Sequence, residues 1–499
     1  MPQHRTSGVF LHLTSLPGPD GIGDLGAGAR TFPEFLDRAD QRYWQFCPLG
    51  PTSGVHGHSP YAADSAFAGN PLLVDLRSLV DRGYLDDGDL GGPDGADPHT
   101  VEYDTVAAYK RDRLRRAYER FRETDDESAR DSFEAFRERE ASWLADYALY
   151  AALKDAHEGA WTDWPADLAH RDPNALADAR ERHAEAVEYH AFVQWVFDEQ
   201  WQRLREAADE RGIELVGDLP LYVAADSADV WASPETFDLD DEGRPAVVAG
   251  VPPNPGDDGQ RWGNPVYDWD HLRETGYEWW LDRVRRLLSR VDVARIDHFK
   301  GFDEFWAIPA DADSPAAGEW REGPGADFFE AVAADLELPA DDLPFLAEDL
   351  GFIDEGVVAL RDHFSIPGMR VPQYADWCSE DSRDKPVNYP RDAVAYTSTH
   401  DTDTAVGYYE SLPEEQRDCL RYALATDGSE INWDLIEAVW DSEAVLAMTT
   451  MQDLLGLGSE ARFNTPGTAE GNWRWRVTED ALTDDIATEL AGITTATLR

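Results

Sequence analysis

Lysine, cysteine and long apolar runs are scarce in this sequence. Only four of the 499 residues are lysine, and 100 Asp and Glu stand against 44 Lys and Arg, which gives a formal net charge of −56. A surface this acidic repels nucleic acid and anionic lipid, whereas a neutral ligand such as a sugar feels no net Coulomb force from it. We therefore expect neither a nucleic-acid partner nor a membrane partner.

The acidic residues are spread over the whole length instead of gathering in a tail. Self-repulsion in such a chain is screened when the ionic strength is high, because the Debye length shrinks as salt is added. This distribution leads to the hypothesis that the protein is adapted to high salt, as in a halophile. Unfolding on dialysis to low salt would support the hypothesis, and full stability there would contradict it.

An apolar run of the roughly 18 residues that a membrane-spanning helix needs is absent, and residues 1–15 lack the regions of a secretory signal. We therefore predict a cytoplasmic protein. The cysteines Cys47, Cys378 and Cys419 are odd in number, far apart and outside any metal-ligand spacing. We expect three free thiols, and neither a disulfide nor a zinc site.

Short apolar runs alternate with helical stretches over much of the chain. The runs are expected to be strands, and they comprise residues 9–13, 43–46, 214–216, 291–296, 345–347, 368–371 and 394–397. Between residues 101 and 210 the pattern changes to charged helices with apolar residues three and four apart, broken near Trp164-Pro165 and Asp172-Pro173. The last of these helices is expected from about Ala175 to Arg211.

Buried strands separated by helices indicate a parallel α/β sheet. In a chain this long, a (β/α)8 TIM barrel with inserted, largely helical subdomains is favoured over a doubly wound sheet. No glycine-rich phosphate loop follows any of the runs, which weakens the nucleotide-binding alternative. We predict that residues 1–80 form the first part of the barrel, 81–210 a mostly helical insertion, and 211–499 the remainder of the barrel.

Several of the predicted strands finish in an acidic residue, at the end where a barrel presents its active site. These residues are Asp218, Asp297, Glu348 and Asp401. A single Asp after a strand is more often a helix N-cap, but four at strand ends are expected to converge on one pocket. Carboxylates in that number suit either metal binding or glycoside cleavage, in which one group is a nucleophile and another a proton donor.

The neighbouring residues favour glycoside cleavage. Arg295 lies two residues before Asp297 and hence on the same face of the strand, where a buried guanidinium would keep the carboxylate ionised, as a nucleophile requires. A structural ion pair would have the same spacing. Glu348 follows an apolar strand, where burial and nearby carboxylates would raise its pKa, as an acid/base catalyst requires.

Aromatic residues in predicted loops near the same end of the barrel can stack on the apolar faces of sugar rings. They are Tyr61, Trp262, Tyr267, Trp473 and Trp475. For any single one of them, ordinary core packing is the commoner role. Trp473-Arg474-Trp475 alternates and also fits a strand.

Long motifs follow one another from end to end of the chain. They include Ser59-Pro60-Tyr61, Gly217-Asp218-Leu219-Pro220, Gln260-Arg261-Trp262-Gly263-Asn264-Pro265, Arg295-Ile296-Asp297-His298-Phe299, Ala347-Glu348-Asp349-Leu350-Gly351, Thr399-His400-Asp401-Thr402-Asp403-Thr404 and Arg462-Phe463-Asn464-Thr465-Pro466-Gly467-Thr468. In content and order these motifs resemble those of the amylomaltase, or disproportionating enzyme, family of 4-α-glucanotransferases.

The resemblance implies a barrel without a separate C-terminal β-domain and a retaining double displacement on α-1,4-glucans. Asp297 is then the nucleophile, Glu348 the acid/base, and Asp401 the third carboxylate, which favours a distorted, oxocarbenium-like ring. No metal and no organic cofactor is implied. Positions that bind substrate in the family fall on Tyr61, Asp218, Trp262, Arg295, His400 and Asn464.

The implied substrates are maltooligosaccharides and starch or glycogen-type α-glucans, with glucose as an acceptor, for a monomer or weak homo-oligomer. Residues 250–265 are expected to form a lid loop that excludes water, because water and a glucan 4-hydroxyl compete for the covalent intermediate. The sequence departs from the family pattern at residues 254–258, which lack aromatics, and at 53–58. Acceptor preference and the ratio of transfer to hydrolysis depend on those loops.

Two other functions compete with glucan transfer. An α-amylase-type hydrolase on the same barrel is disfavoured by the family match over the whole chain and by the absent C-terminal domain. A non-catalytic glucan-binding protein would require a lost carboxylate, and Asp297, Glu348 and Asp401 are all present.

Overall fold

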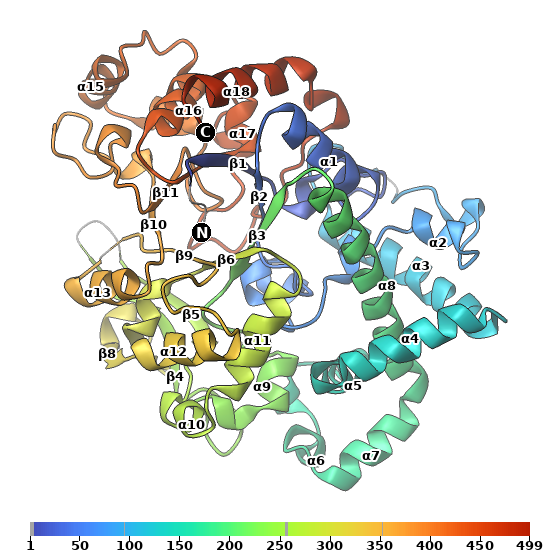
Figure 1. Cartoon of the computed structure of the whole chain (residues 1–499). Coiled ribbons are helices and arrows are strands. Elements are labelled where there is room, and N and C mark those ends of the chain that lie inside the picture. The colour runs from blue at the N-terminus through green and yellow to red at the C-terminus, as the bar shows by residue number, and fades with distance from the viewer. Residues whose placement is uncertain (1–3, 94, 255–257, 352) are drawn as a thin grey trace.

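In the computed structural model, which describes residues 4–93, 95–254, 258–351 and 353–499, parallel strands at the centre of the molecule close into a barrel (Figure 1). The order around the barrel is β1-β12-β11-β10-β9-β6-β3-β2. The strands are β1 Thr6–Phe10, β2 Tyr43–Gln45, β3 Glu214–Leu219, β6 Val293–Ile296, β9 Phe345–Ala347, β10 Gly368–Arg370, β11 Ala393–Tyr396 and β12 Leu446–Thr450. The predicted TIM barrel is confirmed.

Alternation along the strands separates two apolar layers. Val216, Val293 and Leu346 belong to a compact cluster made almost entirely of barrel-strand residues, which fills the inside of the barrel. Their neighbours Leu215 and Ala294 belong instead to the large cluster that includes the outer helices. The short apolar runs in the sequence are thus strands that are buried on both faces, as in other parallel sheets.

Each predicted run overlaps a barrel strand, but two details differ. The first strand lies at Thr6–Phe10, three residues before the predicted position. The strand β12, which closes the barrel between β1 and β11, was missed. Its residues lead directly into a helix at Met451 without an intervening glycine or proline, so the turn signals that bound the other strands are missing there.

The charged segment between β2 and β3 is helical, as expected, and lies on one side of the barrel, from cyan to green in Figure 1. Asp172 caps the helix that starts at Pro173, at one of the predicted breaks. The long last helix was predicted wrongly as continuous, because it is interrupted at His183. The helices are α3 Tyr103–Glu123, α4 Glu127–Arg139, α5 Ala141–Ala156, α6 Ala166–Ala169, α7 Pro173–Arg182 and α8 Ala184–Asp209.

An antiparallel sheet of order β5-β4-β7-β8 was not predicted. Its strands are β4 Val247–Val251, β5 Gln260–Pro265, β7 Glu304–Pro309 and β8 Glu319–Glu322. Much of the expected lid loop at 250–265 is therefore a hairpin of β4 and β5, and residues 255–257 lie outside the described part of the chain. Prolines are disfavoured inside paired strands, and here Pro252-Pro253 lies between β4 and β5 and leaves both strands free to pair.

The remaining helices cover the outside of the barrel and its two ends (Figure 1). None of the helices in the described ranges is both long and apolar enough to cross a membrane. Their bounds are α1 Ala27–Arg38, α2 Arg77–Asp81, α9 Ala228–Ala232, α10 Trp269–Glu274, α11 Glu278–Leu288, α12 Ala326–Asp335, α13 Glu355–His363, α14 Ala405–Ser411, α15 Glu414–Leu424, α16 Ile431–Asp441, α17 Met451–Leu454 and α18 Asp484–Ala496.

The expectation of three free thiols was wrong for two of them. Cys378 and Cys419 form a disulfide across a sequence separation of 41 residues, with a Cα–Cα distance of 5.2 Å. It joins the segment after β10 to α15 near a small apolar cluster that includes Trp377 and Leu420. Spacing could not reveal the pair, because it depends on how α15 packs against a distant segment. Cys47 is a free, buried thiol, as expected.

Candidate active site

Strand register brings the predicted carboxylates to one edge of the barrel. Asp218 in β3 is paired with Arg295 in β6, and the last residues of β6 and β9 are paired with each other. The next residues along these parallel strands, Asp297 and Glu348, therefore emerge at the same edge, and the charge of Asp297 acts on Glu348. Asp401 lies in the loop that follows β11.

Arg295 is shared between two carboxylates. Its Nη1 donates to Asp297 Oδ1 at 3.0 Å and to Asp218 Oδ2 at 2.6 Å, so the contact expected between Arg295 and Asp297 is present. The side chain of Asp218 is fully buried, whereas that of Asp297 is 26% exposed. Burial raises the pKa of Asp218 to about 6, and the charge of Arg295 opposes this rise. Of these two carboxylates, Asp297 is therefore the one that is accessible from solvent.

Tyr61 links this group to Asp401. Its hydroxyl donates to Asp218 Oδ2 at 2.7 Å and lies 2.9 Å from His400 Nε2. The same imidazole nitrogen is 3.1 Å from Asp401 Oδ2. Burial lowers the pKa of His400, but the charge and hydrogen bond of Asp401 outweigh this and raise it. Burial also opposes ionisation of Asp401, yet His400 lowers the pKa of Asp401 to about 2.

Glu348 accepts hydrogen bonds from backbone N–H groups in the described part of the chain, and from no cationic side chain there. Its Oε2 accepts from His298 at 2.8 Å and its Oε1 from Leu350 at 3.0 Å. Burial raises the pKa of Glu348 to about 7; Asp297 adds to the rise, while Arg295 and the two N–H donors oppose it. The group therefore holds a proton near neutral pH, as the sequence predicted for an acid/base catalyst.

The loop that carries Asp401 is tied to the segment after α17. Asn464 Nδ2 donates to Asp401 Oδ1 at 2.6 Å, and Arg462 Nη2 donates to the backbone carbonyl of Asp401 at 2.7 Å. Arg462 Nε also donates to the carbonyl of Asn464 at 2.8 Å, which joins the two loops. The Asp401 side chain is still 38% exposed. The sequence indicated Asn464 and missed Arg462, although both belong to one motif.

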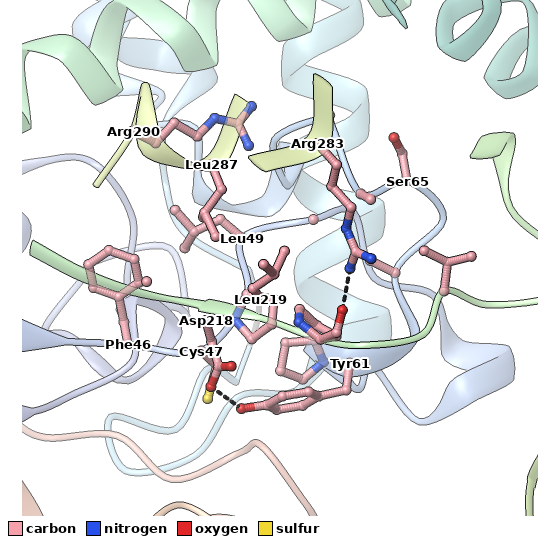
Figure 2. A pocket seen from close by; sticks show the side chains of 18 of the residues that line it. Phe46, Cys47, Leu49, Tyr61, Ser65, Asp218, Leu219, Arg283, Leu287 and Arg290 are labelled. Atoms are coloured by element: carbon pink, nitrogen blue, oxygen red, sulfur yellow. Dashed lines mark hydrogen bonds between the residues drawn. The ribbon is translucent and has the colours of Figure 1, made fainter. Parts of the chain in front are cut away.

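A cavity of about 60 Å³ lies behind Asp218 and Tyr61 (Figure 2). The segments after β2 and β3 line it on one side, with the free thiol of Cys47, and α11 lines it with Arg283. Burial raises the pKa of the Cys47 thiol well above its usual range, so this thiol stays protonated. Because Asp297, Glu348 and Asp401 do not line the cavity, it lies beside this group of carboxylates and not between them.

Two exposed aromatic rings lie near the carboxylates. Trp262 in β5 is 37% exposed, and its ring is perpendicular to that of His298 at a centroid distance of 4.9 Å. Tyr374 was not singled out from the sequence; it is 53% exposed and follows β10. Desolvation and the negative charges of Glu348 and Asp401 raise the pKa of Tyr374 to about 12, so its hydroxyl lies within electrostatic range of both carboxylates. Its position just after a strand end was the signal available.

The other predicted aromatics are mostly packing residues. Tyr267 is buried and donates its hydroxyl to the carbonyl of Leu221. Trp473 is buried against the rings of Tyr61 and His400, and its φ of +64° does not fit a strand. Trp475 forms one isolated antiparallel bridge. Of these aromatic residues, Trp262 and Tyr374 are therefore the exposed ones, and Tyr61 is half-buried.

The alternative of a metal site was left open by the carboxylates alone. Within the described ranges, no three His, Cys, Asp or Glu side chains are grouped so that they could hold a metal ion. The arrangement instead provides a carboxyl group that holds a proton near neutrality, an ionised carboxylate beside an imidazole, and a carboxylate beside a guanidinium. This set matches the requirements for cleaving a glycosidic bond.

Comparison with known proteins agrees with this chemistry. A family model described as 4-alpha-glucanotransferase matches residues 11–483. The chain is 46% identical over 506 residues to a 4-alpha-glucanotransferase of Thermus thermophilus, with 99% of each chain covered. It is 45% identical over 502 residues to a 4-alpha-glucanotransferase of Synechocystis sp., covering 99% of this chain and 98% of the relative.

The fold is also similar to solved structures. Amylomaltase from Streptococcus agalactiae, in complex with acarbose, matches with a TM-score of 0.95 at 36% sequence identity, covering 99% of both chains. Amylomaltase from Corynebacterium glutamicum has the same fold, with a TM-score of 0.79 at 19% identity over 98% of this chain and 75% of that one.

Proposed function

This chain belongs to the 4-alpha-glucanotransferase family, and on that premise we propose that Asp297, Glu348 and Asp401 carry out the reaction at the mouth of the barrel. The activity is transfer of an α-1,4-glucan segment from a donor to the 4-hydroxyl of an acceptor. The observation that carries the assignment is that each carboxylate has a different partner: a guanidinium for Asp297, backbone N–H groups for Glu348, and the imidazole of His400 for Asp401.

In the first step, an oxygen of Asp297 attacks the anomeric carbon of the donor. The bond from that carbon to the glycosidic oxygen breaks, and Glu348 gives its proton to the departing 4-oxygen. Arg295 holds Asp297 in position through the 3.0 Å contact. The product of this step is a glycosyl-enzyme ester in which the configuration at the anomeric carbon is inverted.

In the second step, Glu348 is a carboxylate and acts as the base. It removes the proton from the 4-hydroxyl of an incoming glucose or maltooligosaccharide, and the resulting oxygen attacks the anomeric carbon. Asp297 leaves as a carboxylate, and the second inversion restores the original configuration. Water competes for the same ester, so the outcome depends on how well the acceptor is bound and water is excluded.

The third carboxylate and its neighbours bind the sugar ring undergoing substitution. Asp401 and Asn464 offer hydrogen bonds to sugar hydroxyls, and His400 keeps Asp401 ionised. A negative charge at this place stabilises the positive charge that develops on the ring in an oxocarbenium-like transition state. Tyr61, Asp218 and Arg295 form the base of the same substrate site.

The rings of Trp262 and Tyr374 provide flat apolar faces for sugar units next to the site of cleavage. Trp262 belongs to the hairpin of β4 and β5, so we propose that this hairpin, within residues 250–265, acts as the lid.

We also propose the division of the chain into 1–80, 81–210 and 211–499, with the middle part as an insertion. We propose that the donors are starch or glycogen-type glucans and that glucose serves as an acceptor. We further propose a cytoplasmic location and a monomer or weak homo-oligomer.

Product analysis tests the function and the nucleophile together. Incubation with maltotriose in concentrated salt is expected to give glucose and a ladder of longer maltooligosaccharides. Shorter sugars alone would indicate a hydrolase, and unchanged maltotriose would indicate a protein that only binds glucans. Asp297→Ala is expected to abolish both turnover and the mass shift of the trapped glycosyl-enzyme, and wild-type turnover in this variant would refute the assignment.

A further inference from the structure

We infer that Asp453 is a positioning residue that sets the geometry of the loop bearing His400 and Asp401. Asp453 lies in α17, directly after β12, and is completely buried. It touches none of the groups assigned above to the reaction, and the reaction steps do not use it. The inference deepens the proposed function and rests on the role given there to Asp401.

The carboxylate of Asp453 holds both ends of that loop. Its Oδ2 accepts the hydroxyl hydrogens of Thr397 and Ser398, each at 2.6 Å. Its Oδ1 accepts the backbone N–H of Ala405 at 2.7 Å. Thr397 and Ser398 precede residues 399–404, and Ala405 follows them. One rigid side chain therefore fixes the separation of the two stems between which His400 and Asp401 lie.

Asp453 is itself anchored to the barrel. Its N–H donates to Thr450 Oγ1 at 3.3 Å, and its carbonyl accepts from Asn432 Nδ2 of α16 at 2.9 Å. Thr450 is the last residue of β12, which pairs in parallel with β11. The hydroxyl of Thr450 also lies 3.0 Å from that of Ser398. Asp453 and its hydrogen bonds to Thr397, Ser398 and Ala405, which we call the clamp, thus connect the loop after β11 to a neighbouring barrel strand.

The chemistry requires a carboxylate at this position. Three donors converge on its two oxygens, and an ionised carboxylate presents acceptors only, whereas an amide would direct an N–H2 group at one of these donors. In the described part of the chain no cationic side chain hydrogen-bonds to Asp453, and burial raises its pKa. A residue needed only to fill space would avoid this desolvation cost. Binding the loop stems accounts for the carboxylate.

Asp453 contacts the two stems of the loop, whereas the contacts described above are made to His400 and Asp401 themselves. Arg462 and Asn464 hold Asp401 from the segment after α17, and Tyr61 contacts His400. Without Asp453, these contacts would remain but the loop stems would be free to separate. A shift of about 1 Å in a catalytic group can cost on the order of 100-fold in rate. Loss of the clamp is therefore expected to reduce turnover through Asp401.

A double-mutant cycle tests this coupling. Asp453→Asn is expected to lower kcat for maltotriose disproportionation by about 10- to 100-fold, with a smaller change in KM. Asp401→Asn is expected to lower kcat further, and the double variant should be no slower than Asp401→Asn alone, because Asp453 acts through the loop. Multiplied losses in the double variant, or full activity of Asp453→Asn, would overturn the inference. Full activity of Asp401→Asn would overturn the proposed role of Asp401 instead.

A matched control separates positioning from general destabilisation. Asp75 is buried and accepts backbone N–H groups from Arg77 and Ser78, remote in the chain from the Asp401 loop. Asp75→Asn should lower the melting temperature, as Asp453→Asn does, but its kcat should stay within about twofold of the wild-type value. An equal loss of kcat in the two variants would overturn the inference.

The inference also remains testable if Asp453→Asn does not fold. Ser398→Ala then replaces it in the cycle, because it removes a single bond to Asp453. A smaller loss of kcat that disappears in the Asp401→Asn background is expected. Unchanged activity of Ser398→Ala, or a loss that persists in the Asp401→Asn background, would count against the clamp.

Discussion

Substituting Glu348 by glutamine isolates proton donation from the other functions of the site. The pKa of Glu348 is about 7, so about half of the enzyme holds the catalytic proton at pH 7 and about a tenth at pH 8. Cleavage of maltotriose needs that proton. We therefore expect kcat/KM for maltotriose in the wild type to fall about tenfold for each pH unit above 7.

The decisive substrate is α-maltotriosyl fluoride, because fluoride leaves without being protonated. With this donor, the burst of fluoride that accompanies ester formation should stay level above pH 7 in the wild type. Glu348→Gln should retain most of that burst, while its kcat/KM for maltotriose falls by roughly 10²- to 10⁴-fold. The transfer step that follows the burst should be slow in the variant, since no base is left to deprotonate the acceptor.

The substitution also has a structural effect that must be separated from the chemical one. An amide nitrogen cannot accept from an N–H group, so one of the bonds from His298 and Leu350 is lost, at a cost of about 1 kcal/mol in folding stability. A melting curve measures that part. If maltotriose cleavage stays level to pH 9, or if Glu348→Gln loses activity equally with both donors, the acid/base assignment is refuted.

Three further outcomes follow from the structure and the composition. Dialysis from concentrated to low salt should unfold the protein, as followed by circular dichroism, because the charge of −56 is then unscreened; a native spectrum at low salt would contradict adaptation to high salt. Reduction of the disulfide, or the substitution Cys378→Ser, should lower the free energy of unfolding by about 4 kcal/mol, because the bond spans a sequence separation of 41 residues. Denaturant titration measures this loss, and the pH profile of activity should not change. Trp262→Ala and Tyr374→Ala should each raise the fraction of glucosyl ester lost to water, measured as reducing ends per transfer product, and an unchanged ratio would show that neither ring binds the acceptor.

The barrel and the carboxylates at its edge could be predicted because their signals are local. Asp297 and Glu348 each follow directly after a buried apolar run, and strand geometry alone places Arg295 on the same face as Asp297. Tyr374 lies shortly after β10 and Arg462 lies beyond α17. Neither is acidic, so the acidic strand ends did not single them out, although Arg462 stands in the same motif as Asn464.

What the sequence could not reveal depends on contacts between distant segments. In the sequence, Asp453 does not differ from an ordinary helix residue. Its proposed function depends on the pairing of β12 with β11, which brings its carboxylate to hydrogen-bond donors about 50 residues earlier in the chain. Cys378 and Cys419 are adjacent only because α15 packs against the segment after β10. The hairpin of β4 and β5 was obscured because prolines between the two strands resemble the start of a loop.

The scarcity of lysine is reflected in where the lysines lie. Lys110 is completely buried and binds Asp24 at 3.0 Å. Lys300 is 8% exposed and binds two carboxylates at 2.6 and 2.7 Å, and Lys154 binds Asp226 at 2.7 Å. The ammonium groups of Lys110 and Lys300 are buried and that of Lys154 is partly buried, so most of the exposed positive charge is carried by arginine. Bulky, weakly hydrated guanidinium groups suit a surface on which acidic residues dominate.

The partners of the three proposed catalytic carboxylates explain why we assign them different roles. Asp297 lies beside the guanidinium of Arg295, a cation that cannot lose its proton and that holds the carboxylate in position. Burial opposes ionisation of Asp401, but the interaction with His400 lowers the pKa of Asp401 to about 2 and leaves it as a fixed negative charge. Of the three, only Glu348 accepts backbone N–H groups in the described residues; burial and the charge of Asp297 raise its pKa to about 7. A proton that must be given to one sugar and taken from the next can therefore reside only on Glu348, and a variant that placed a cation beside Glu348 would remove that ability without altering a single catalytic residue.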